Sequence, residues 1–173
     1  MKFWLGIAGS VWGLIGISAL LISAIARLMP LSLDLVNFHL TSLQWAVLAI
    51  WLFFMGHFEG YRGFQLQFSP RVAARCLHLK NNPKALHLLL APFFCMGFFY
   101  ATKRRIITTW SITLTIVVMV ILARHLPQPW RGILDAGVCL GLIWGWLSVI
   151  YIAIKTLSRG QTNYSPELPL GQA

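Results

Sequence analysis

Long apolar runs separated by short polar segments dominate the hydrophobic pattern of this chain. Four runs come close to or exceed the roughly twenty residues that a helix needs to cross a bilayer. They cover about residues 3–27, 40–58, 106–123 and 133–154. Apolar residues are continuous in these runs instead of alternating with polar ones, which is the pattern of helices and not of a transmembrane barrel. We therefore expect an all-α fold, a polytopic transmembrane helical bundle with four full spans, as a single domain at residues 1–158.

A fifth apolar segment, at residues 86–101, is shorter than the others and contains Pro92. A short run interrupted by proline is typical of a segment that enters the membrane or lies at its surface without crossing it. We expect a re-entrant or short helix here, which leaves four full spans. The alternative is a fifth span, because a short helix can cross a locally thinned bilayer.

The polar segment between the second and the fifth apolar runs contains one helix signal. Ser69 and Pro70 form a good helix start, because serine caps a helix and proline fits its first turn. Asn82, followed by a proline, forms an equally good end. The pattern predicts a surface amphipathic helix at about 70–81, lying in the headgroup layer of the membrane. The polar residues 159–173 predict a disordered cytoplasmic tail.

The composition supports a membrane location and bears on the kind of partner. Hydrophobic residues make up 58% of the chain and charged residues only 10%, whereas soluble domains are about one quarter charged. The formal net charge is +10. The basic residues are spread over the segments between the apolar runs and form no single basic face, so we expect no nucleic-acid partner. The positive charge instead predicts contact with anionic membrane lipids.

The distribution of lysine and arginine distinguishes four spans from five. Four spans place eleven basic residues on one side of the membrane and three on the other, whereas five spans divide them eight against six. Basic residues collect on the cytoplasmic side of membrane proteins, so the more uneven split is favoured. We therefore expect an integral protein of the bacterial cytoplasmic (inner) membrane, with both termini and the central polar segment in the cytoplasm.

Glycines repeat at helical spacing in the first and last spans, where they let a neighbouring backbone approach closely. Because both terminal spans carry such a stripe, we expect them to pack against each other and close the bundle. The predicted helix-packing residues are Gly6, Gly9, Gly13 and Gly16 in the first span and Gly137, Gly141 and Gly145 in the last.

The best candidate for acid and base chemistry is a group of ionisable residues where the second span ends. His57 and Glu59 lie there, and Glu59 and Arg62 are three residues apart, a spacing at which they pair along a helix. Ionisable groups at membrane depth are costly and often functional, so His57 and Glu59 are candidate catalytic residues. The alternative is a Glu59–Arg62 pair that fixes the helix end, with His57 in an interfacial belt of aromatic residues.

A second candidate site is a collar of basic residues on the predicted cytoplasmic side. An anionic substrate such as a phospholipid headgroup or a polyprenyl phosphate fits such a collar. A general attraction to anionic lipid, of about 1 kcal/mol per basic residue, is the simpler explanation and the favoured one. The candidate anion- or lipid-binding residues are Arg62, Arg71, Arg75, His78, Lys103, Arg104 and Arg105.

Motifs for other kinds of chemistry are absent from the sequence. It contains no HExxH or CxxC metal motif, no GxSxG nucleophile motif, and no P-loop or GxGxxG phosphate motif. Cys76, Cys95 and Cys139 show no paired spacing. We therefore expect no metal, no disulfide framework and no cofactor.

Three classes of function remain open. The first is a small accessory or assembly protein that binds lipids or a membrane-protein partner, or forms a homo-oligomer; the absence of catalytic motifs favours it. The second is a membrane-embedded enzyme that acts on a lipid or isoprenoid phosphate at the cytoplasmic surface, with His57 and Glu59 as acid and base. The third is an oligomeric transporter subunit, since four spans are too few for a transport pathway in one chain.

Overall fold

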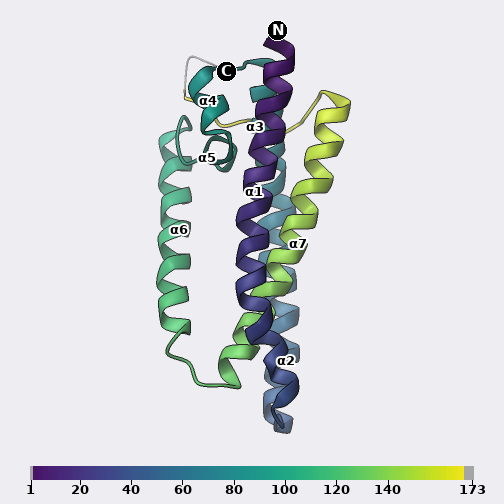
Figure 1. Ribbon diagram of the computed structural model, residues 1–173, viewed down its shortest axis with the longest axis vertical. Helices are drawn as coiled ribbons and strands as arrows, with labels where there is room; N and C mark the ends of the chain where they lie inside the picture. Colours follow the sequence, from purple (N-terminus) through teal and green to yellow (C-terminus); the bar gives the residue numbers. More distant parts are fainter. Residues whose placement is uncertain (1, 170–173) are drawn as a thin grey trace.

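The protein is helical throughout the part that the structure describes. The computed structural model describes residues 2–169, and within that range it contains helices and turns but no strand, which confirms the expected all-α fold. Figure 1 shows the helices in chain order. They are α1 (Lys2–Leu33), η1 (Asp34–Asn37), α2 (Ser42–Met55), η2 (Gly56–Phe68), α3 (Ser69–Asn81), α4 (Ala85–Leu89), α5 (Ala91–Met96), α6 (Lys103–Ala123) and α7 (Trp130–Arg159).

Three helical stretches of residues 2–169 are long and apolar enough to cross a membrane. They are Phe3–Asn37, Lys103–Ala123 and Trp130–Arg159, and they match the first and the last two of the predicted spans. The remaining predicted span, at 40–58, is part of a helix that continues well beyond it.

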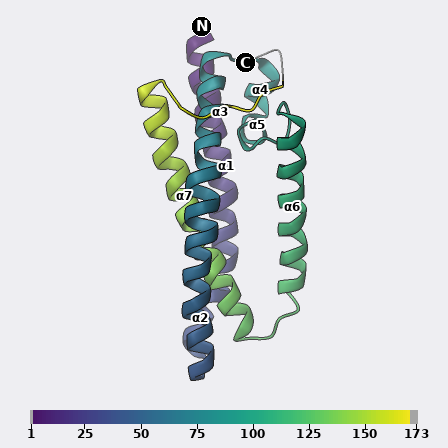
Figure 2. The same ribbon diagram turned by 180° about the vertical axis from the view of Figure 1, so that it is seen from behind.

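That longer helix is a continuous rod made of α2, η2 and α3, seen in both Figure 1 and Figure 2. Thr41 begins the rod with a capping box: its hydroxyl accepts from the Gln44 N–H at 3.4 Å, and the Gln44 side chain accepts from the Thr41 N–H at 2.9 Å. Gly56 keeps a helical backbone, with φ −59° and ψ −44°. The rod therefore does not stop where the apolar run ends.

The middle of the rod, η2, is a π-helix, whose wider turns place backbone bonds between residues five apart. At its end, the Ser69 N–H donates to the Phe64 carbonyl. Pro70 follows directly, and in an α-helix its ring would clash with the carbonyl four residues back. We attribute the passage of the rod through Pro70 to the wider turn before it. The predicted helix at 70–81 is present as α3, but it continues η2 instead of starting freely.

The predicted surface position of this helix is wrong, because α3 packs against both α1 and α7. Nine of its 13 residues are buried. Val72, Cys76 and Leu79 belong to the main hydrophobic core, together with Phe94 and Val149. The side chains that α3 itself carries are small or apolar around most of its circumference. Both α1 and α7 can therefore pack against it at the same time.

The predicted re-entrant segment forms two short helices, α4 and α5, which stay at the end of the molecule where α3 ends and α6 begins (Figure 1). Pro92 lies in the first turn of α5, and Gly97 ends it with φ 87°, a left-handed conformation that favours glycine. Ala91, Phe94 and Cys95 are buried, so the segment packs into the core at this end instead of running the length of the bundle.

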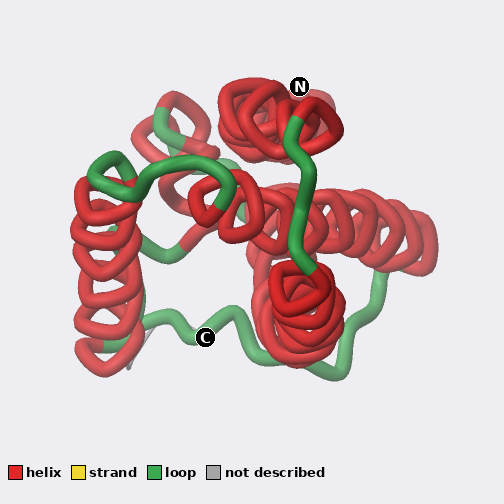
Figure 3. Tube along the Cα trace, turned by 90° about the horizontal axis from the view of Figure 1, so that it is seen from below, coloured by secondary structure: helices red, strands yellow, loops and turns green. Residues whose placement is uncertain are grey.

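Helix α6 stands apart from the other helices along most of its length (Figures 1 and 3). Every residue from 114 to 122 is exposed, which covers more than two turns and so the whole circumference of the helix. The hydroxyl groups of Thr108, Thr113 and Thr115 donate to the carbonyls four residues back. The buried Thr109 hydroxyl has no hydrogen-bond partner among the described residues.

The two glycine stripes face different partners. In α1, a side chain at Gly6 would meet the backbone of Lys80, and one at Gly16 would meet Pro92. In α7, the stripe faces the rod: Trp51 and Met55 lie at Gly137, Glu59 at Gly141 and Phe64 at Gly145. Helices α1 and α7 do contact each other, but not through their glycines.

Residues 160–169 cross the end of the bundle and pack against it. Leu168 is buried in the main core, and the Thr102 N–H donates to the Glu167 carbonyl at 2.9 Å. The expected disordered tail is therefore not observed over 160–169, because an apolar side chain between two prolines is anchored in the core. The prediction for 170–173 falls outside the described residues.

Candidate functional site

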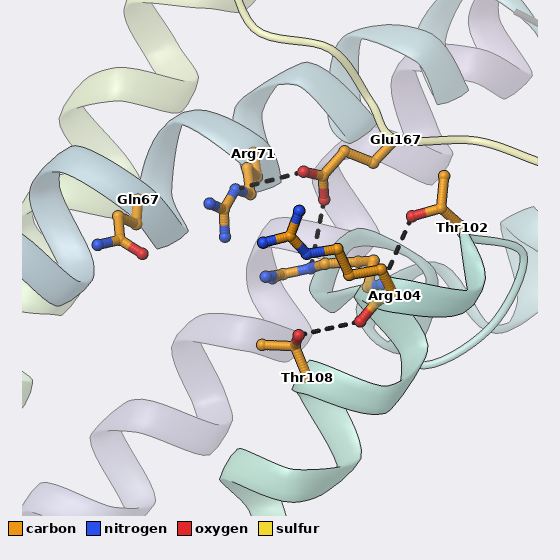
Figure 4. A pocket seen from close by; sticks show the side chains of 7 residues that line it. Gln67, Arg71, Thr102, Arg104, Thr108 and Glu167 are labelled. Atoms are coloured by element: carbon orange, nitrogen blue, oxygen red, sulfur yellow. Dashed lines mark hydrogen bonds and ion pairs between the residues drawn. The ribbon is translucent and has the colours of Figure 1, made fainter.

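Basic residues of α3 and α6 converge at the end of the bundle that the tail crosses (Figure 4). Arg71 lies in the first turn of α3, and Arg104 and Arg105 lie in the first turn of α6. The Thr102 hydroxyl caps α6 by accepting from the Arg105 N–H at 3.4 Å. An open cavity of about 370 Å³ lies between these elements. It is lined by Gln67, Arg71, Thr102, Arg104, Arg105, Thr108 and Glu167.

Glu167 is the one acidic residue that lines this cavity. Its carboxylate lies 3.8 Å from Arg71 Nε and 3.7 Å from Arg105 Nε, distances longer than those of charge-assisted hydrogen bonds. The Glu167 backbone has φ 50°, a conformation that a residue other than glycine adopts at some cost. The carboxylate is thus a loosely held counter-ion, positioned by a backbone that other contacts fix.

The cavity keeps a positive charge after Glu167 is counted. The three guanidinium groups of Arg71, Arg104 and Arg105 less the one carboxylate leave a formal +2. The start of α6 adds the partial positive charge of a helix N-terminus. Guanidinium groups bind phosphate oxygens through paired N–H donors. The arrangement therefore suits a phosphate group with up to two negative charges.

Arg75 lies beside this cavity but points into the protein. Its guanidinium donates to the Phe94 carbonyl at 2.7 Å, the Tyr100 carbonyl at 3.4 Å and the Glu167 carbonyl at 3.3 Å. Burial lowers the pKa of Arg75 to about 10, so it remains charged at neutral pH. We assign to Arg75 the role of joining α3, α5 and the tail.

The other predicted members of the basic collar lie outside the cavity lining. His78 is half-buried with its ring 6.4 Å from the Phe94 ring, and burial, aided by the charges of Arg75 and Lys84, lowers its pKa. Lys103 is exposed. Arg62 lies farther down the rod, exposed, with its guanidinium 5.8 Å from the centre of the Phe58 ring.

The structure does not bring His57 and Glu59 together. His57 is exposed and lies among the rings of Phe53, Phe58 and Tyr61, whereas Glu59 faces α7 at Gly141. The alternative Glu59–Arg62 ion pair is not formed either among residues 2–169. The wider turn of a π-helix moves residues three apart out of alignment, which explains the missing pair.

Sequence reasoning missed two features of this end of the molecule. Glu167 lies in the segment expected to be disordered. It is one of only four acidic residues in the chain, and this scarcity was a signal that it could serve as a counter-ion to the basic residues. Cys76 and Cys95 are buried with their sulfur atoms 3.4 Å apart. Their separation of 19 residues follows no motif, so the sequence gave no indication of this contact.

The fold and the cavity define a class of protein: an all-helical protein with three helices long and apolar enough to cross a membrane and a basic cavity at one end. No group of three or more metal-ligating side chains occurs within residues 2–169. Comparisons of the chain with known protein families, curated protein sequences and solved structures give no match.

Proposed function

We propose that this protein is an integral membrane accessory protein that binds the phosphate headgroup of an anionic lipid. The binding site is the cavity of Arg71, Arg104 and Arg105. The observation that carries the proposal is the convergence of three arginines from two helices around one cavity, with a single loosely paired carboxylate. A phosphate monoester matches the net +2 of the lining better than a diester does, so lipids with a terminal phosphate are the preferred ligands.

The proposed arrangement in the membrane has four spans: α1, the first part of the rod, α6 and α7. The ends of α3 and α7 and the start of α6 share one end of the molecule (Figure 1), and basic residues are concentrated in these segments. Basic residues favour the cytoplasmic side. We therefore assign this end, with both termini, to the cytoplasmic surface of a bacterial inner membrane, where α4 and α5 lie without crossing.

The surroundings of the cavity favour a lipid over a soluble phosphate. Thr108, in the second turn of α6, is part of the lining, and below it the helix is apolar and exposed around its whole circumference from 114 to 122. Acyl chains beside α6 would cover this surface while the headgroup occupies the cavity. An amphiphile uses both features, whereas a free phosphate uses only one.

Native mass spectrometry of the detergent-solubilised protein tests the proposal. Phosphatidic acid, phosphatidylglycerol and phosphatidylcholine are titrated separately, and inorganic phosphate serves as the soluble competitor. We expect affinity to fall in that order of lipids. The double variant Arg71→Gln/Arg105→Gln should bind phosphatidic acid roughly ten- to a hundredfold more weakly, from about 1 kcal/mol or more per lost arginine.

The matched control is Lys103→Gln/Arg159→Gln, which removes two exposed basic residues of the same end that do not line the cavity. This variant should retain most of the affinity. Equal losses in both double variants would reduce the site to a general attraction between the basic end and anionic lipid, and the proposal would fail. The catalytic hypothesis gains no support from the geometry, because His57 and Glu59 face different neighbours.

A further inference from the structure

Glu59 lies in a row of rod residues that face the glycine stripe of α7. The row is Trp51, Met55, Glu59 and Phe64, opposite Gly137, Gly141 and Gly145. The steps along the rod are four, four and five residues, while the glycines are spaced by four. The π-helix supplies the extra residue that keeps Phe64 opposite its glycine. Glu59 is the one polar member of an otherwise apolar row.

The glycine at position 141 makes room for the Glu59 carboxyl group. A methyl group placed at Gly141 would lie 2.9 Å from Glu59 Oε2 and 3.0 Å from its carboxyl carbon. The carboxyl group therefore lies directly on the backbone surface of α7, between the two helices.

This contact lies deep within the apolar layer of the molecule. Gly141 is ten residues beyond Arg131 and fourteen before Lys155, about 15 Å and about 21 Å along the axis of α7. The hydrocarbon core of a bilayer is about 30 Å thick. Measured along α7, Glu59 thus lies near the middle of the apolar stretch of that helix, while on the rod the exposed Arg62 follows it by less than one turn.

No charged group compensates Glu59 among the described residues. It has no hydrogen bond or ion pair within that range. On α7, Asp135 pairs with Arg131 at 3.3 Å, and the remaining ionisable groups are Cys139, Tyr151, Lys155 and Arg159. The three atoms nearest to a methyl group placed at Gly141 all belong to Glu59.

The rod provides no compensating group either. α2 contains no ionisable side chain. Within η2, His57 and Arg62 lie on the exposed side against aromatic rings. In α3, Arg71 and Arg75 are engaged at the far end with Glu167.

We propose that the Glu59 carboxyl group is a proton-binding site in the membrane interior, which takes up and releases a proton from its position against Gly141. An isolated carboxylate in an apolar environment is so costly that such a group takes up a proton instead. As a neutral acid, Glu59 fits the helix interface without a counter-ion. This site is independent of the basic cavity and of its ligand.

A hydrophobic carbodiimide tests the proposal, because carbodiimides react with protonated carboxyl groups in apolar surroundings. The full-length protein in membrane vesicles is treated with dicyclohexylcarbodiimide over a range of pH, and the modified residue is located by mass spectrometry of its peptides. We expect modification at Glu59 that falls about tenfold per pH unit above the titration midpoint. It should be lost in Glu59→Gln and kept in Asp135→Asn, which removes the paired acid of α7.

Several outcomes would overturn the proposal. They are an unmodified Glu59 at acidic and neutral pH, modification that does not change with pH, and protection by sodium at constant pH, which would indicate a metal cation as ligand. If Glu59→Gln does not fold, the pH dependence of modification at Glu59 in the unaltered chain still decides. The infrared carbonyl band of a protonated carboxylic acid, followed over the same pH range in Asp135→Asn, provides an independent measurement.

Discussion

Two glutamates of this protein lie in opposite surroundings. Glu167 lines an open cavity beside the guanidinium groups of Arg71 and Arg105. Glu59 faces Gly141 between apolar neighbours and has no ion pair among the described residues. An ionised carboxylate costs little in the first setting and several kcal/mol in the second. The same side chain is therefore suited to offsetting positive charge at the end of the bundle and to holding a proton in its middle.

This difference predicts how each region responds to change. The basic end tolerates altered charge at its exposed positions, because water and neighbouring ions screen it. The contact between Glu59 and Gly141 in the middle of the bundle tolerates a neutral group of the same shape as Glu59. It tolerates neither an uncompensated charge nor added volume.

The largest expected effect on stability comes from Arg75, a charged residue of the basic end that is buried like the residues in the middle of the bundle. Arg75 belongs to the basic end but is 2% exposed, and its guanidinium satisfies three backbone carbonyls. We expect Arg75→Gln to lower the free energy of unfolding by about 3 to 5 kcal/mol, because buried acceptors lose their charged donor. Thermal unfolding in detergent micelles measures the change.

The matched control is Arg71→Gln at the same end. Arg71 is about a third exposed and its ion pair with Glu167 is long, so its loss should cost less than about 1 kcal/mol. Comparable destabilisation by the two variants would mean that the buried carbonyl contacts of Arg75 do not hold this end together.

The second effect concerns the Glu59 contact in the middle. Gly141→Ala places a methyl group 2.9 Å from the Glu59 carboxyl oxygen, and such overpacking costs about 1 to 3 kcal/mol. In a Glu59→Ala background the same substitution should cost less than about 0.5 kcal/mol, because the space is free. A double-mutant cycle of unfolding free energies gives the coupling.

Gly56→Ala serves as the comparison within the same helix pair. Its added methyl group would meet a Leu140 methyl group at 3.5 Å, an ordinary contact, and alanine favours the helix. We expect no loss of stability there. If the costs of Gly141→Ala and Glu59→Ala simply add, the methyl group at position 141 does not touch the Glu59 side chain.

Much of the fold was predictable because hydrophobic runs alone determine where long helices form. The runs at 3–27, 106–123 and 133–154 correspond to helices that are long and apolar enough to cross a membrane. The continuity of the rod was not predictable from polarity. Gly56 and Pro70 are ordinary breaking signals, and only the wide π-helical turns and the cover provided by α1 and α7 carry the helix through them.

The candidate site was only partly predictable for a similar reason. Charge in the sequence identified the basic end, but not which arginines share a cavity, because Arg71 and Arg75 are one turn apart and point to different surroundings. Glu167 was missed because its segment is ordered by Leu168, whose burial depends on tertiary contacts. The glycine stripes indicated close packing but not the partner of each stripe.

A smaller effect is expected from the loosely held counter-ion. Glu167→Gln removes the carboxylate from the cavity while its backbone contact with Thr102 remains. Affinity for phosphatidic acid should rise about fivefold, equivalent to about 1 kcal/mol of repulsion removed. Native mass spectrometry measures it, with Glu167→Asp as the charge-retaining control. A weaker affinity in Glu167→Gln would indicate that the carboxylate organises the arginines for the ligand.

The smallest effect is a pH dependence of stability at the basic end. His87 is 3% exposed, its ring stacks on Phe94 at 4.5 Å and lies 4.4 Å from the Tyr100 ring, and its Nδ1 has no hydrogen-bond partner among the described residues. Burial, followed by the charge of Lys84, lowers its pKa. The folded protein therefore holds His87 neutral at a pH where the unfolded chain already begins to protonate it.

Acidification consequently favours the unfolded chain. Below the ordinary histidine pKa of about 6.5, the unfolded state binds more protons at His87 than the folded state, so stability falls as the pH falls. His87→Phe keeps the ring stacking and removes the proton uptake. Below that pH, the unfolding temperature of this variant should decline less steeply than that of the unaltered protein. The corresponding difference in the free energy of unfolding should be less than about 1 kcal/mol. Parallel curves of unfolding temperature against pH would assign the acid sensitivity to other groups, with the half-buried His78 the next to test.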